Sequence, residues 1–138
     1  MENVVLDTNC LVSSLKRSST YFPIWRDFIL GKYCLCFTDD ILHEYQEIIE
    51  KLTGSPMIAR NIIAAILNRN NILHVEVFYH FELITADKDD NKFVDCAIKA
   101  DAKFIVSNDK HFDVLKTIPF PRVEVIDIDK FLEELKKY

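Results

Sequence analysis

The sequence has little glycine and no long apolar run. Only two of its 138 residues are glycine. No apolar stretch reaches the roughly 18 residues that a membrane-spanning helix needs. The start, Met1 to Asn3, lacks the basic and then apolar layout of a signal peptide. With 49% hydrophobic and 28% charged residues, the composition is that of an ordered globular chain. We therefore expect an ordered cytoplasmic protein with no membrane partner.

The chain also lacks the motifs of several common sites. It has no Cys-x-x-Cys pair, no glycine-rich phosphate-binding loop and no Gly-x-Ser-x-Gly hydrolase motif. Its cysteines lie inside apolar segments, which predicts buried free thiols. They are Cys10, Cys34, Cys36 and Cys96. The four histidines are scattered without metal-ligand spacing, which favours surface or helix-end positions. They are His43, His74, His80 and His111.

The chain has fewer basic than acidic residues. Lysine and arginine number 17 against 22 aspartates and glutamates, and the formal net charge is −5. The whole molecule therefore exerts no general attraction on a polyanion, and binding of nucleic acid would need a local patch. A charge sum, however, counts the carboxylates of a metal site as bare, and a bound divalent cation reverses their local sign. Charge alone does not exclude an RNA partner.

Strand and helix patterns alternate along the chain. Strands are predicted at 3–6, 33–37, 72–78, 103–107 and 122–126. The runs just before Asp7 and Ser107 are apolar at every position, which fits strands buried on both faces. Helical periodicity predicts helices at 10–16, 21–31, 39–52, 56–69, 90–101, 110–117 and 128–137. Strands separated by helices predict an α/β fold with three α/β/α layers and a mainly parallel central sheet of about five strands. The length fits a single domain over residues 1–138.

Capping residues support several of these helix boundaries. Thr38 and Asp39 suit the start of helix 39–52, and Gly54 suits its end. Pro56 suits the first turn of the next helix. Further caps are expected where the helices after residue 109 begin, from Asp109 and from Asp127 or Asp129.

An aspartate follows the carboxyl end of two predicted strands. Asp7 follows strand 3–6, and Asp109 follows strand 103–107. Ligands of parallel sheets bind beyond the carboxyl ends of the strands, so two carboxylates placed there could meet around a cation. Taken singly, each aspartate could equally be a turn or cap residue.

Helix faces single out two further acids. In helix 39–52, Glu44 borders the apolar stripe, whereas Glu47 and Glu50 fall on the opposite side. That stripe consists of Ile41, Leu42, Tyr45, Ile48, Ile49 and Leu52. In helix 90–101, the helical periodicity places Asp90 on the inner face at the amino end, where it could also serve as a cap. The same periodicity predicts that Asp95 points outward.

Convergence of the four acids would require a cation. Unpaired carboxylates crowded together repel one another strongly. Hard divalent cations with oxygen ligands, Mg²⁺ or Mn²⁺, fit such a group best.

The same residues carry a resemblance to a known family. The chain resembles PIN-domain ribonucleases, in particular the VapC-like toxin components of bacterial toxin–antitoxin pairs. The resemblance spans nearly the whole chain in the family's order and runs through Val4–Asn9, Ile41–Tyr45, Asp89–Phe93 with Ala97, and Ile105–Lys110. The resemblance implies four catalytic and metal-binding acids, Asp7, Glu44, Asp90 and Asp109. It also implies supporting polar residues near the metal, Thr8, Asn9 and Ser107.

Ala97 follows Asp90 by seven residues, a family spacing that selects Asp90, although Asp89 and Asp95 stay open as substitutes. The implied chemistry is metal-dependent hydrolysis of an RNA phosphodiester, in which Asp7, Asp90 and Asp109 hold one or two Mg²⁺ or Mn²⁺ ions. Glu44 would then bind a second ion or orient the attacking water. Homodimerisation and control by an antitoxin protein are also expected from the resemblance.

Other side chains leave their roles open. Four basic residues near the motifs could hold an RNA backbone or be solvated surface charges. They are Lys16, Arg17, Lys92 and Lys110. Helical spacing makes the aromatic cluster of Tyr21, Phe22 and Trp25 a better candidate for core or subunit contacts than for base stacking.

Two alternatives to a toxin stay open at this point. One is a catalytically silent binding module of the same fold, and the other is an RNA-processing nuclease without an antitoxin. A phosphotransfer domain is disfavoured, because the first strand is followed by Asp7-Thr8-Asn9 rather than by paired acids or Asp-x-Asp.

Overall fold

A five-stranded sheet with every strand parallel forms the centre of the protein in the computed structural model, which describes residues 1–138. Its order is β3-β2-β1-β4-β5. The strands are β1 (Asn3–Leu6), β2 (Cys34–Phe37), β3 (Ile72–His74), β4 (Phe104–Val106) and β5 (Val125–Ile126). The chain runs outward from β1 to β3 on one side and then returns to the other side for β4 and β5. The carboxyl ends of β1 and β4 therefore adjoin at the topological switch point, where such sheets bind ligands.

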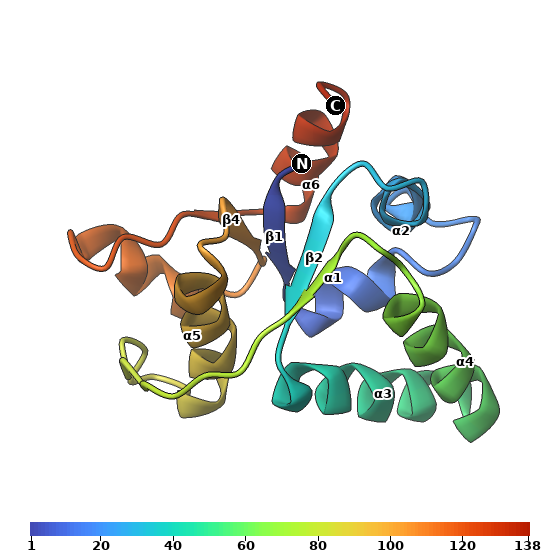
Figure 1. Ribbon diagram of the computed structural model, residues 1–138, viewed down its shortest axis with the longest axis horizontal. Coiled ribbons are helices and arrows are strands. Elements are labelled where there is room, and N and C mark those ends of the chain that lie inside the picture. The colour runs from blue at the N-terminus through green and yellow to red at the C-terminus, as the bar shows by residue number, and fades with distance from the viewer.

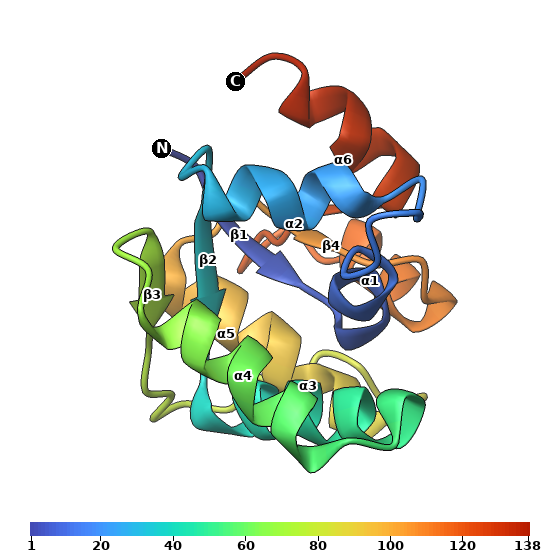
Figure 2. The same ribbon diagram turned by 90° about the vertical axis from the view of Figure 1, so that its right-hand side faces the viewer.

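Helices cover both faces of the sheet. They are α1 (Thr8–Ser13), α2 (Phe22–Ile29), α3 (Asp39–Thr53), α4 (Pro56–Leu67), α5 (Asn91–Ala100) and α6 (Ile128–Leu135), with 3₁₀ helices η1 (Lys88–Asp90) and η2 (Lys110–Thr117). In Figure 1, α5 lies on one side of β1 and β2, and α1, α2 and α4 lie on the other. Figure 2 shows the second group in front of the strands and α5 behind them. The predicted three-layer α/β/α arrangement is confirmed.

Most of the predicted capping residues act as expected. The Thr38 hydroxyl accepts from the Ile41 amide at 3.3 Å, and Gly54 ends α3 in the left-handed conformation at φ 67°. Pro56 occupies the first turn of α4. At the start of α6, Asp127 accepts from the Lys130 amide at 2.7 Å. These contacts set where the helices beside the sheet begin and end.

Both edge strands are shorter than predicted. The predicted strand 72–78 ends at His74, and residues 75–87 continue without a ladder apart from one bond of the Val75 amide to the Phe37 carbonyl, at 2.9 Å. At the other edge, only Val125 and Ile126 of the predicted strand 122–126 form β5, a few residues after Pro119 and Pro121. An edge strand has a neighbour on one side only, and proline donates no ladder hydrogen bond. Apolar pattern alone therefore overestimated both lengths.

Three helix predictions also need adjustment. The predicted helix 10–16 is α1, which starts at Thr8, directly after the first aspartate, and ends at Ser13. The predicted helix 110–117 is a 3₁₀ helix, whereas the predicted helix 90–101 agrees with α5, which begins one residue later, directly after the 3₁₀ turn η1. Leu52 was wrongly assigned to the apolar stripe of α3. Its exposure is 68%, because the last turn of α3 projects into solvent.

The core is one cluster of 31 buried residues that runs through the central strands. Val4, Val5, Leu35 and Ile105 are completely inaccessible, as expected for strands covered on both faces. All four cysteines are free thiols, and only Cys34 is not fully buried. The aromatic ring of Trp25 packs against this core, in agreement with a packing role. None of the helices has the length and apolar character needed to cross a bilayer.

Candidate metal centre

Asp7 lies directly at the end of β1 and is 9% exposed. Its amide extends the ladder by donating to the Val106 carbonyl at 3.0 Å. The carboxylate makes no capping bond to α1 and instead accepts from the Ser107 hydroxyl at 2.6 Å. Burial is the largest cause that raises the pKa of Asp7, with the nearby charges of Asp90 and Glu44 adding to it and the Ser107 bond opposing it. The side chain is therefore available for a ligand and is costly to keep charged without one.

The end of β4 supplies the second acid. The Asp109 amide donates to Ser107 Oγ at 3.0 Å, so one serine touches both Asp7 and Asp109. Asp109 Oδ1 accepts from the His111 amide at 2.9 Å, which confirms the predicted cap of η2. The neighbouring Asn108 accepts from the Ile128 amide at 3.0 Å and so ties this turn to α6. The turn after β4 is thus fixed by its own hydrogen bonds.

Asp90 stands at the start of α5 but does not cap it by a side-chain bond. Its Oδ2 lies 3.0 Å from His111 Nδ1, and the same ring nitrogen lies 3.3 Å from Asp109 Oδ1. Two of the predicted acids therefore meet at one imidazole. The hydrogen bond to Asp90 is the main cause that raises the pKa of His111, and burial raises the pKa of Asp90.

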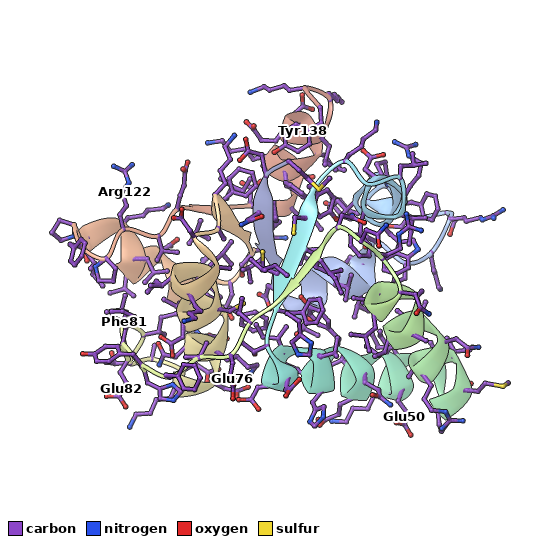
Figure 3. The ribbon with its side chains drawn as sticks, in the orientation of Figure 1. Glu50, Glu76, Phe81, Glu82, Arg122 and Tyr138 are labelled. Carbon is purple, nitrogen blue, oxygen red and sulfur yellow. The ribbon has the colours of Figure 1, made fainter.

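Glu44 reaches the same region from α3. Its Oε2 accepts from the Thr8 hydroxyl, and its Oε1 lies 2.8 Å from Lys92 Nζ. Glu47 and Glu50 are exposed, and Figure 3 shows Glu50 at the outer edge of the molecule near the far end of α3. The ranking of the three glutamates from helix periodicity is confirmed.

The predicted supporting residues have different surroundings. Thr8 and Ser107 are buried and hold Glu44 and Asp7, respectively. Asn9 is exposed and lines, with Asp7 and Asp109, a cavity of about 260 Å³.

The two possible substitutes for Asp90 are engaged elsewhere. Asp89 is exposed and forms an ion pair with Lys92 at 2.9 Å. The expectation that Asp95 points outward is wrong, since its exposure is 4%. The segment 75–87 folds back beside α5 and covers this side chain, with Phe81 lying next to the helix in Figure 3. Asp95 accepts from the Phe81 amide at 3.1 Å and lies 3.3 Å from His80.

Two residues of the site, His111 and Asp87, were not predicted from the sequence, and a third, Lys92, was predicted in another role, as a possible RNA contact. His111 and Lys92 contact the predicted acids directly, and Asp87 joins Asp90 and His111 in a group whose ligand atoms lie within 4.8 Å of one another. A signal existed for two of them. His111 and Lys92 each follow a predicted acid by two residues, at the start of a helix.

The donor set fits a divalent cation. Carboxylate oxygens suit Mg²⁺ and Mn²⁺, and imidazole is a good additional ligand for a transition metal such as Mn²⁺. Next to these acids lies a groove of about 1220 Å³, which Glu44, Asp89 and Lys92 line together with Glu76 and Glu82. The whole edge is strongly acidic, and a cation would lower the repulsion among its carboxylates.

By its fold and candidate site, the protein is an α/β protein with a parallel sheet and a candidate metal site of acidic residues at the switch point. A sequence profile of the PIN domain matches residues 3–111, and the chain belongs to this family. No curated protein sequence matches the chain. Among solved structures, a chain of VapBC2 from Rickettsia felis bound to a DNA fragment from its promoter superposes with a TM-score of 0.62. It is 18% identical, and the match covers 91% of this chain and 98% of that chain. At this identity the likeness concerns the fold.

Proposed function

We propose that the protein is a metal-dependent endoribonuclease that hydrolyses RNA phosphodiester bonds. The observation that carries the proposal is the linkage of three acids from separate elements. Asp7 and Asp109 share Ser107, and Asp109 and Asp90 share the imidazole of His111. Membership of the PIN domain family gives independent support.

Each acid has a role in this proposal. Asp7, Asp90 and Asp109 would hold one or two Mg²⁺ or Mn²⁺ ions, and Glu44 would orient the attacking water or bind a second ion. A bound divalent ion lowers the pKa of water and neutralises charge on the phosphoryl oxygens. Ser107 and Thr8 keep the Asp7 and Glu44 carboxylates in fixed orientations through their hydroxyl groups. Asn9 lines the same cavity as Asp7.

RNA would have to approach an acidic edge, so the metal itself would be the main attraction for the phosphate. Lys16, Arg17 and Lys110 stay candidates for backbone contacts. Lys92 is a poor candidate, because Glu44 and Asp89 already engage its ammonium group. Tyr21, the tyrosine of the aromatic cluster, packs partly buried against the core, which agrees with a packing role, and its hydroxyl donates to Asp129 at 3.1 Å.

Within this proposal the chain is a single-domain cytoplasmic toxin whose activity an antitoxin protein restrains. Support comes from the resemblance to VapC-like toxins and from the similarity in fold to a chain of VapBC2. A homodimer is the oligomeric state expected from the same resemblance. A small regulator encoded next to this gene would favour the toxin over an RNA-processing nuclease.

The decisive experiment compares wild type with Asp7→Asn on single-stranded RNA in the presence of Mn²⁺. We expect cleavage by wild type and a loss of at least about 100-fold in the variant, since even indirect partners of metal ligands contribute 10–100-fold. Glu50→Gln is the matched control, because Glu50 lies on the helix of Glu44 but faces solvent. Equal rates for wild type and Asp7→Asn would contradict the proposal. No cleavage by either protein would favour a catalytically silent PIN module.

A further inference from the structure

We propose that the ammonium group of Lys92 takes the place of a second cation beside Glu44, so that the site binds one divalent ion and not two. The inference rests on the proposed metal site and specifies it further. It concerns the group formed by Glu44, Asp89 and Lys92, whose ion pairs are separate from those around His111.

All three ammonium hydrogens of Lys92 have an acceptor. Lys92 Nζ lies 2.8 Å from Glu44 Oε1, 2.9 Å from Asp89 Oδ2 and 3.0 Å from the Asp89 carbonyl oxygen. A lysine ammonium has three donors and no acceptor, so no donor is left for an RNA phosphate. The side chain is only 14% exposed. Lys92 is therefore a fixed internal cation and not a mobile surface charge.

Both oxygens of Glu44 are engaged. One of its oxygens accepts from Thr8 and the other from Lys92. Each oxygen keeps a second lone pair, so a metal ion bound directly to Glu44 would share the carboxylate with Lys92. The ion and the ammonium group would then lie a few ångströms apart on one carboxylate that is 26% exposed, and their like charges would repel each other. Thus Lys92 already supplies the positive charge that a second ion would bring to Glu44.

The group around His111 keeps ligands for one ion. Asp90 and Asp109 face His111, not Lys92, and Asp87 adds a third oxygen donor near the same imidazole. Asp7 touches this group through Ser107. The site would thus contain two positive charges of different kinds, one bound divalent ion and the ammonium group of Lys92. Glu44 would then hold Lys92 and use its remaining lone pairs to orient water, but it would not be a metal ligand.

The test is a count of bound Mn²⁺ ions in the full chain without RNA. The electron paramagnetic resonance signal of free aqueous Mn²⁺ is followed during titration of wild type and Lys92→Met. We expect one ion per chain in wild type and two in the variant. Two ions about 4 Å apart, as in two-metal sites, also give a spin-coupled spectrum, which we expect in the variant alone.

Two control variants separate charge from side-chain loss. Lys92→Arg keeps the positive charge and should bind one ion. Lys88→Met removes an exposed lysine from the same groove and should also bind one. If Lys92→Met does not fold, Lys92→Gln provides the same charge removal with a polar side chain.

Several results would overturn the inference. These are two ions in wild type, or a folded Lys92→Met or Lys92→Gln protein that binds a single ion. A wild-type chain that binds no Mn²⁺ would overturn it together with the proposed metal site. A chain that binds one ion, gains a second on loss of Lys92 and yet cleaves no RNA would support the inference and contradict only the nuclease.

Discussion

Ser107 links two acids of the site through one hydroxyl group. It donates to Asp7 at 2.6 Å and accepts from the Asp109 amide at 3.0 Å, and it is 5% exposed. Asp7 and Asp109 are about a hundred positions apart in sequence, yet a single small side chain sets their separation. Small polar residues beside a metal site act in this way, as orienting partners of the ligands.

Asn91 plays a comparable part for the segment 75–87. Its side-chain amide donates to the Ile84 carbonyl and accepts from the Ile84 amide, both at 2.9 Å, and so imitates a pair of strand hydrogen bonds. The pair is buried and holds the segment beside the helix that begins after Asp90.

Asn91→Ala should destabilise the protein by about 2 to 4 kcal/mol, because two buried backbone groups lose their partners at about 1–3 kcal/mol each and part of that cost is relieved by water. Urea unfolding followed by circular dichroism measures this. Asn70→Ala, at an exposed bend, should change stability by less than about 0.5 kcal/mol. Similar losses in both variants would refute the role given to Asn91.

At the scale of secondary-structure elements, α3 is fixed to the end of β1. The hydroxyl of the fully buried Tyr45 donates to the Leu6 carbonyl at 2.6 Å, one residue before Asp7. The residue before Tyr45 on this helix is Glu44, so this bond helps to set the distance between Glu44 on α3 and Asp7 at the end of β1.

Tyr45→Phe keeps the ring and removes only this donor. We expect a loss of about 1 to 2 kcal/mol in the free energy of unfolding, the usual effect of a buried hydrogen bond that leaves its acceptor unpaired. Tyr79→Phe is the comparison, because Tyr79 is 69% exposed. Thermal unfolding of the two variants should differ clearly. An unchanged Tyr45→Phe protein would show that the Leu6 carbonyl finds another donor.

For the whole molecule, the acidic edge opposes folding when no metal is bound. The pKa of Asp7 is raised in the folded protein, so folding favours its neutral form. The stability gained from that form is fully present below the ordinary pKa of 3.8 and is lost as the pH rises through the raised value. Above that value, an ionised Asp7 destabilises the folded state.

Asp7→Asn should therefore raise the melting temperature of the metal-free protein at pH 7, by about 2 to 5 °C, the shift that roughly 1 kcal/mol produces in a domain of this size. Mn²⁺ should stabilise wild type, since it binds the folded state, and should have little effect on Asp7→Asn. Differential scanning calorimetry in EDTA and in Mn²⁺ measures both effects. An Asp7→Asn variant that melts below wild type in EDTA would contradict the electrostatic account. The control is Asp113→Asn, because Asp113 is exposed.

The sequence alone determined the order of strands and helices, the parallel sheet and the inward face of α3. These follow from local patterns: unbroken apolar runs for strands covered on both sides, helical periodicity for Glu44, and caps such as Thr38 and Gly54. The candidate acids were also readable, because strand ends and helix faces are encoded within a few residues.

Only the tertiary structure decided which partners those acids have. His111 is bound to Asp90 because η2 and α5 approach each other, and Asp95 is covered because the segment 75–87 folds back over its helix. Likewise, Lys92 lies between Glu44 and Asp89 because α3 meets the start of α5. Local patterns indicate which side of a helix faces inward, but contacts between distant segments depend on how the elements pack. The same packing turns Lys92 from a candidate RNA contact into a cation of the site itself.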